Sequence, residues 1–185
     1  MRITSTEARN MKGETLIAGL SATIAFGAAA LALWTARGTS RKDGYELARV
    51  LYRELTSSET AAHRSALEFY RRAAHRTQPE TEAVLDHYFV LLWAFEHVRA
   101  GRQSLEQQRR INGTGPVVNY LDSAISWHVR EWSTRWSHLR QLIQEHVPQL
   151  DDRHSISTFC ELADEVLGAT DTIDALRAET NADLR

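Results

Sequence analysis

The sequence predicts an all-α protein in which a single N-terminal transmembrane helix precedes a helical bundle of four to five helices. Three observations support this class. Residues 15–36 carry no charge, the apolar residues beyond them recur at helical spacing, and the prolines fall where helices would begin or end. We therefore expect an N-terminal tail (1–14), a transmembrane helix (15–36), a juxtamembrane amphipathic helix (37–56), a bundle domain (57–180) and a C-terminal tail (181–185).

The uncharged stretch 15–36 is long enough to cross a membrane. As a helix that rises about 1.5 Å per residue it extends roughly 33 Å, close to the thickness of the hydrocarbon layer. Two alternatives stay open: an export signal cleaved after its small residues, which would release a secreted helical domain, and a helix buried in a soluble core. The length of the run and the basic residues directly after it favour an uncleaved anchor: Arg37, Arg41 and Lys42.

Charge on either side of this stretch predicts its orientation. Five basic residues follow it before residue 54 and three precede it, a bias that favours a cytoplasmic C-terminal domain. The single cysteine, Cys160, cannot form an internal disulfide, which agrees with a reducing compartment. The sequence thus predicts a single-pass protein of the cell membrane, and the lipid bilayer is one of its predicted partners.

Small residues form a stripe within the predicted span. Gly19, Thr23 and Gly27 recur every four residues, so they share one helix face and would let a second helix approach closely. They are a candidate helix-pairing face, and a homodimer or another protein is a candidate partner. Small residues are common in spans, so the same spacing also arises without pairing.

The segment after the basic exit is predicted to form an amphipathic helix. Its apolar residues share one face, which is the side expected to be buried: Leu47, Val50, Leu51 and Leu55. This helix is expected to continue from the span or to hinge at Gly38 or Gly44.

A second helix is predicted over 57–75, because Thr56 stands three residues before Glu59, the spacing of a capping box. Its buried side is expected to be formed by the apolar residues at helical spacing: Ala62, Ala66, Phe69 and Ala73.

The remaining helices are predicted from prolines, glycines and apolar runs. Pro79 at a first-turn position begins a central core helix that is expected to end at Gly101. Pro116 begins a long helix that should reach about Val147. A final amphipathic segment is expected to start near Ser155 and to break near Gly168.

The order of these segments resembles a known bacterial family. An N-terminal span, "WTARGTSRK", "SSETAAHRSALEFYRR", "VLDHYFVLLWAFEHVRAG" and "WHVREWSTRW" together are similar to the membrane-anchored helical proteins of domain of unknown function 4760, from about Leu16 to Val147. The family pattern has an Asn and a Glu within the core helix, where this chain has Asp86 and Phe89. The resemblance implies a membrane-bound helical body and brings no activity with it.

No catalytic or ligand-binding pattern is recognised, so the sequence predicts a protein that is not an enzyme, with no cofactor and no small-molecule ligand. The nearest approach to a metal site is His128 with Glu131, which could meet Glu96 and His97 if their helices were antiparallel neighbours. A membrane-tethered metal-dependent enzyme therefore stays the alternative function. Residues 37–185 carry 19 basic and 22 acidic side chains, and this balance predicts no nucleic-acid partner.

The tryptophans of the long helix provide a candidate surface. At 100° per residue, Trp127 points about 140° away from Trp132, so the two cannot face the same core. We expect Trp127 to pack against another helix of the bundle. If it is exposed instead, Trp127 with Arg130 and Arg135 forms a candidate surface for a partner or for lipid headgroups.

Overall fold

The computed structural model describes residues 34–182, and this part of the chain is built of helices joined by short turns. The all-α class and the helical bundle are therefore confirmed. A first helix covers residues 34–56 and is followed by α2 (Ser58–Arg72), α3 (Gln78–Gln107), α4 (Arg109–Asn112), α5 (Gly115–Ser133), α6 (Trp136–Gln144), α7 (Arg153–Leu167) and α8 (Asp171–Ala182).

The predicted span lies outside the described residues apart from its last three, 34–36, and the proposed pairing face of Gly19, Thr23 and Gly27 lies wholly outside them. Among the helices of residues 34–182, none combines the length and the apolar character that crossing a bilayer requires.

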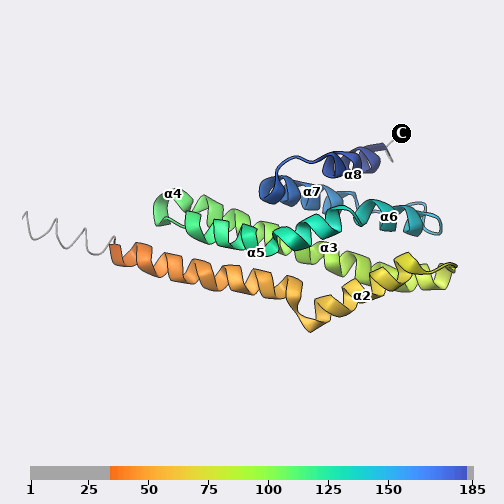
Figure 1. Ribbon diagram of the computed structural model, residues 1–185, viewed down its shortest axis with the longest axis horizontal. Helices are drawn as coiled ribbons and strands as arrows, with labels where there is room; N and C mark the ends of the chain where they lie inside the picture. Colours follow the sequence, from red (N-terminus) through yellow and green to blue (C-terminus); the bar gives the residue numbers. More distant parts are fainter. Residues whose placement is uncertain (1–33, 183–185) are drawn as a thin grey trace, which may run out of the picture.

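The 30-residue helix α3 is the axis of the body. Figure 1 shows the helix 34–56 and α2 following one another along one side of α3. Helix α5 lies beside α3 at the end where the helix 34–56 begins, and α7 and α8 form an outer layer over α3 and α5. The long axis of the body therefore runs parallel to the helix 34–56.

The helix 34–56 is continuous, so neither Gly38 nor Gly44 acts as a hinge. It ends at a sharp turn where Ser57, not Thr56, caps α2: the Ser57 hydroxyl accepts a hydrogen bond from the Thr60 amide at 3.1 Å. The cap is thus one residue later than predicted, and the predicted capping box of Thr56 and Glu59 does not form.

Helix α2 buries a different face from the one predicted. Phe69 is 80% exposed, whereas Thr60, Leu67 and Tyr70 are buried. The Tyr70 hydroxyl shares a 2.9 Å hydrogen bond with the Thr81 hydroxyl and donates to the Leu142 carbonyl, which accounts for the orientation of the helix. A buried tyrosine needs such partners, and Phe69 offers no polar group that could compete.

Helix α3 begins as predicted, with Pro79 in its first turn and a capping box between Thr77 and Glu80. It does not end at Gly101 but continues to Gln107. At Gly101 the helix 34–56 packs closely on α3, because a Cβ built there would lie 2.5 Å from the Leu51 Cδ1 atom.

The predicted long helix is divided in two, since α5 ends at Ser133 and α6 begins at Trp136. The predicted break near Gly168 is confirmed, and this glycine has a φ of 78°. Around the division lies a cluster of buried rings that joins α3, α5, α6 and α7: Tyr88, Phe95, Trp132, Trp136 and Phe159.

Two charged networks are buried among the helices. Asp152 accepts hydrogen bonds from the Tyr88 hydroxyl at 2.6 Å and from the Arg140 Nε at 2.8 Å. The pKa of Tyr88 is raised well above its ordinary value, mainly by burial and to a smaller extent by the nearby Asp152 carboxylate. Arg102 connects α3 with Asp122 of α5 and Glu165 of α7. These bonds fix how α3, α5, α6 and α7 pack on one another.

Candidate interaction surface

Four aromatic side chains line the boundary between the helix 34–56 and α5, and we call this surface the aromatic seam: Tyr45, Tyr52, Tyr120 and Trp127. Tyr45 and Tyr52 are seven residues apart on one helix, and Tyr120 and Trp127 are seven residues apart on the other. Residues at this spacing share one helix face. The two helices run in the same direction, so the seam follows the long axis of the body (Figure 1).

Rings of the two helices meet at two places along the boundary. The centroids of Tyr45 and Tyr120 are 5.6 Å apart in an edge-to-face arrangement. Seven residues further along the helix 34–56, Tyr52 lies 6.2 Å from the imidazole of His128, next to Trp127. Beneath the seam the two backbones approach closely at Gly44, where a Cβ would contact Val117 at 3.4 Å. The seam is therefore a firm surface supported by packed helices.

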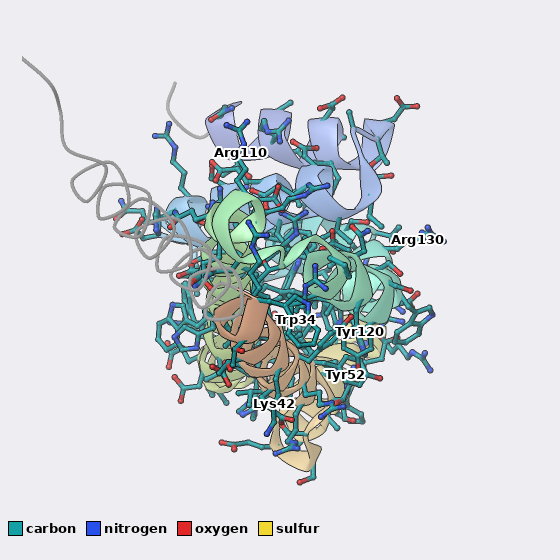
Figure 2. The ribbon with its side chains drawn as sticks, turned by 90° about the vertical axis from the view of Figure 1, so that its left-hand side faces the viewer. Trp34, Lys42, Tyr52, Arg110, Tyr120 and Arg130 are labelled. Atoms are coloured by element: carbon teal, nitrogen blue, oxygen red, sulfur yellow. The ribbon has the colours of Figure 1, made fainter. Side chains whose placement is uncertain are left out.

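The seam is open to solvent along most of its length. Tyr52 is 37% exposed, Tyr120 is 42% exposed and Trp127 is 61% exposed, whereas Tyr45 is half-buried. Figure 2, which looks along the seam, shows Tyr52 and Tyr120 on the same side of the molecule. Aromatic residues usually bury most of their area, so a row of exposed rings is a candidate contact surface.

Two polar side chains, His128 and Arg64, lie next to Trp127 beneath the seam. The Arg64 guanidinium donates to the Nδ1 atom of His128 over 3.1 Å, because arginine has no acceptor. Burial, and then the charge of Arg64, lowers the pKa of His128. The imidazole is therefore held neutral, and its ring supports the Trp127 indole at 4.9 Å.

The structure separates the three residues that the sequence grouped as a candidate surface. Trp127 does not pack inside the bundle as expected, and Arg130 is also exposed. Arg135 instead forms ion pairs with Glu131 and Glu68, and its guanidinium lies 5.3 Å from the centre of the Trp132 ring. Arg135, at the start of α6, therefore belongs to the contact between α6 and α2 and not to the seam.

Sequence reasoning missed the three tyrosines of the seam. A signal for them exists, because Tyr45 and Tyr52 repeat the seven-residue spacing of Tyr120 and Trp127. The sequence does not show that the helix 34–56 and α5 lie side by side, because α2 and α3 separate them along the chain.

A second exposed apolar area lies between α2 and α3 and includes Phe69 and Trp93, 80% and 51% exposed. At its centre the Nδ1 atoms of His63 and His87 are 2.7 Å apart, so one imidazole donates and the other accepts. The two imidazole rings meet across the boundary between α2 and α3, with centroids 4.9 Å apart, but Phe69 and Trp93 do not repeat the seven-residue spacing of the seam. It provides matched controls for experiments on the seam.

The proposed convergence of His128, Glu131, Glu96 and His97 does not occur. His128 contacts Arg64, and His97 instead contacts the Glu54 carboxylate at 2.9 Å. Within residues 34–182 no three His, Cys, Asp or Glu side chains are grouped so as to hold a metal ion.

The chain matches no protein-family model, no curated protein and no solved structure. The resemblance to domain of unknown function 4760 thus stays a prediction from the segments quoted above. Function has to be argued from the geometry of this chain.

Proposed function

We propose that this protein is a membrane-anchored interaction module. The uncharged segment 15–36 holds the chain in the cell membrane as a single-pass anchor, and the helical domain lies on the cytoplasmic side. The domain acts by binding another protein through the aromatic seam. The row of three exposed rings along the seam, Tyr52, Tyr120 and Trp127, is the observation that carries this proposal.

The partner that fits the seam best is a second copy of this chain. Copies anchored through the same segment share one orientation, and with upright bodies they hold their seams at the same height above the membrane. Two identical faces can then meet about a two-fold axis parallel to the seam. Confinement to a membrane also raises the effective concentration of copies, so a modest contact area is enough. The predicted pairing face, Gly19, Thr23 and Gly27, would add to the same association.

Cysteine cross-linking in membranes tests this proposal. The only cysteine of the chain, Cys160, is buried, and burial raises the pKa of its thiol to about 11, so it contributes little background. Ser123 is exposed on α5 between Tyr120 and Trp127 and is therefore suitable for a Ser123→Cys reporter. The exposed Ser157 of α7 offers the matched control Ser157→Cys.

We expect oxidation of membranes to produce a disulfide-linked dimer with Ser123→Cys and not with Ser157→Cys. Adding Tyr120→Ser and Trp127→Ser should abolish the dimer, because these changes remove the exposed rings. Adding Phe69→Ser and Trp93→Ser, which removes equally exposed rings elsewhere, should leave it intact. Equal cross-linking at both reporters, or cross-linking of Ser123→Cys to another protein alone, would reject the second copy as partner.

The anchor is tested separately by washing the same membranes with alkaline carbonate. An integral protein stays in the pellet, whereas a peripheral or secreted protein is released. Release of the full-length chain would overturn the anchor while leaving the cross-linking result informative about the seam.

A further inference from the structure

Two segments far apart in the sequence meet at the end of the body where the helix 34–56 begins. The Nε atom of Arg41 donates to the Gly113 carbonyl at 3.1 Å, although 72 residues separate them. Gly113 ends α4 with a φ of 67°, and a Cβ there would lie 2.9 Å from an Arg41 nitrogen. The short helix α4 is thereby held against the first turns of the helix 34–56 (Figure 1).

This contact brings together a group of cations that we call the basic end: Arg37, Arg41, Lys42, Arg109 and Arg110. All five belong to exposed residues. Glu106 pairs with Arg109 at 2.9 Å, Asp43 follows Lys42 in the chain, and Asp122 and Glu165 line the pocket on the inner side of Arg109. Figure 2 views the body from this end, with Lys42 and Arg110 on opposite sides of Trp34.

The charge of the body is polarised. Between residues 153 and 182, which cover α7 and α8, six acidic side chains oppose two basic ones. The chain as a whole has a formal net charge of −2, so the basic end is a local feature and not a consequence of overall composition. Such a local surplus attracts an anionic surface from one direction only.

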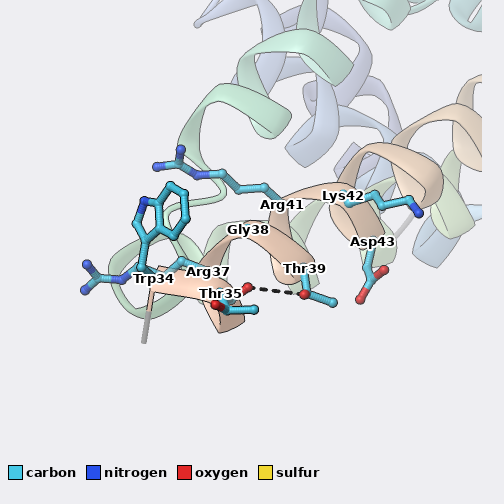
Figure 3. A pocket seen from close by; sticks show the side chains of 8 residues that line it. All are labelled: Trp34, Thr35, Arg37, Gly38, Thr39, Arg41, Lys42 and Asp43. Atoms are coloured by element: carbon cyan, nitrogen blue, oxygen red, sulfur yellow. Dashed lines mark hydrogen bonds between the residues drawn. The ribbon is translucent and has the colours of Figure 1, made fainter. Parts of the chain in front are cut away.

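An exposed tryptophan lies within the basic end. Trp34 is 75% exposed, and it shares a helix face with Gly38 and Arg41. Because Gly38 has no side chain, a hollow lies between the indole and the Arg41 side chain, as Figure 3 shows. Tryptophan is typical of the headgroup level of a bilayer, and the guanidinium fork matches the oxygens of a phosphate.

We propose that the basic end binds the headgroups of anionic phospholipids. This inference rests on the proposed anchor, because Trp34 belongs to the C-terminal end of the segment 15–36. Arg41, which holds α4, is seven residues beyond Trp34, or roughly 10 Å along the helix. That is close to the Debye length, about 8 Å at physiological ionic strength, so cations held beside Arg41 are only partly screened from an anionic membrane. Binding there would hold the body upright, with its seam facing neighbouring copies.

The lipid retained by the full-length protein tests the inference. The protein is incorporated into membranes of equal phosphatidylglycerol and phosphatidylcholine, extracted in mild detergent, and its retained lipids are measured by mass spectrometry. We expect phosphatidylglycerol to be enriched over phosphatidylcholine. An Arg109→Gln, Arg110→Gln variant should lose most of this enrichment, with roughly a fivefold weaker interaction for each cation removed.

The matched control removes two exposed arginines that lie elsewhere, Arg53→Gln and Arg153→Gln. Arg53 is 19 residues beyond Trp34, roughly 28 Å along the helix, and is therefore screened from the membrane. This variant should retain the enrichment of the unmodified protein. No enrichment in the unmodified protein, or an equal loss in both double variants, would overturn the headgroup surface.

The anchor and the headgroup surface fail in different ways. A chain that stays in carbonate-washed membranes without enriching phosphatidylglycerol keeps the anchor and rejects the headgroup surface. A chain released by carbonate rejects the anchor. If the released chain then floats with phosphatidylglycerol vesicles only when Arg109 and Arg110 are present, the headgroup surface is supported independently; if it does not float, that surface is rejected too.

Discussion

Replacing Gly101 with alanine tests how tightly α3 is packed against the helix 34–56. In an exposed helix this change stabilises by about 1 kcal/mol, because alanine is the better helix former. Here the new Cβ would lie 2.5 Å from Cδ1 and 2.8 Å from Cδ2 of Leu51, well inside ordinary contact distance. Leu51 is only 5% exposed, so its side chain cannot move aside without disturbing the core. Overpacking of this kind costs about 1–3 kcal/mol, and we expect a net loss of about 1 kcal/mol in the free energy of unfolding.

A double-mutant cycle isolates the contact. Leu51→Ala alone should cost about 2–5 kcal/mol, because it leaves a cavity. In that background Gly101→Ala should stabilise by about 1 kcal/mol, since the clash is gone and the helix propensity remains. The sign of the glycine substitution therefore reverses, with a coupling of about 2 kcal/mol.

Urea unfolding of the full chain in mild detergent measures the cycle, with fluorescence of the buried Trp132 and Trp136 as the signal. Gly38→Ala is the matched control, because a Cβ there meets nothing within 4 Å, and it should stabilise by up to about 1 kcal/mol. The reasoning is refuted if Gly101→Ala stabilises the unmodified chain as much as Gly38→Ala does.

Two further predictions concern charged groups. Asp152→Ala removes a fully buried carboxylate from its tyrosine and arginine partners, so it should lower the free energy of unfolding by about 3–5 kcal/mol in the same urea assay. Asp151→Ala at the exposed neighbouring position should change this free energy by less than about 0.5 kcal/mol. The hydrogen bond from Arg71 is the main reason that the pKa of Glu68 falls from 4.5 to about 2. The ionised Glu68 carboxylate therefore stabilises the folded protein fully above pH 4.5, and this contribution is lost as the pH falls towards 2. Glu68→Gln should cost about 1 kcal/mol at pH 7, because solvent screens the pair, and should flatten the pH dependence of stability over that window; an unchanged slope would contradict this.

The sequence predicts the class of fold well because helix-forming signals in this chain are local. Pro79 lies in the first turn of α3, and the break at Gly168 follows from its positive φ. Gly101 misleads for a physical reason: it looks like a helix end but is needed for close approach to Leu51, a contact between segments 50 residues apart. Spacing rules cannot predict a helix boundary that depends on packing between distant segments.

The buried face of α2 shows a related difficulty. Counting apolar residues selects Phe69, yet the structure buries Tyr70, whose hydroxyl bonds to Thr81 and to the Leu142 carbonyl. Simple hydrophobicity underestimates a tyrosine whose polar end is satisfied inside the protein.

The candidate site was predictable only in part. The sequence shows that Trp127 and Trp132 face different ways, which left open whether Trp127 is packed or exposed; the structure shows it to be 61% exposed. The tyrosines join it only because the helix 34–56 lies against α5, and the basic end exists only because Arg41 contacts Gly113. Each surface is assembled from distant segments and cannot be read from either segment alone.

The central claim is that the aromatic seam joins two copies of a membrane-anchored chain. The most direct measurement is the number of chains per particle, obtained by analytical ultracentrifugation of the full-length protein extracted from membranes in mild detergent. We predict two chains for the unmodified protein and for the Phe69→Ser, Trp93→Ser variant, and one chain for the Tyr120→Ser, Trp127→Ser variant. A single chain in the unmodified protein, or two chains regardless of the seam, would contradict the account.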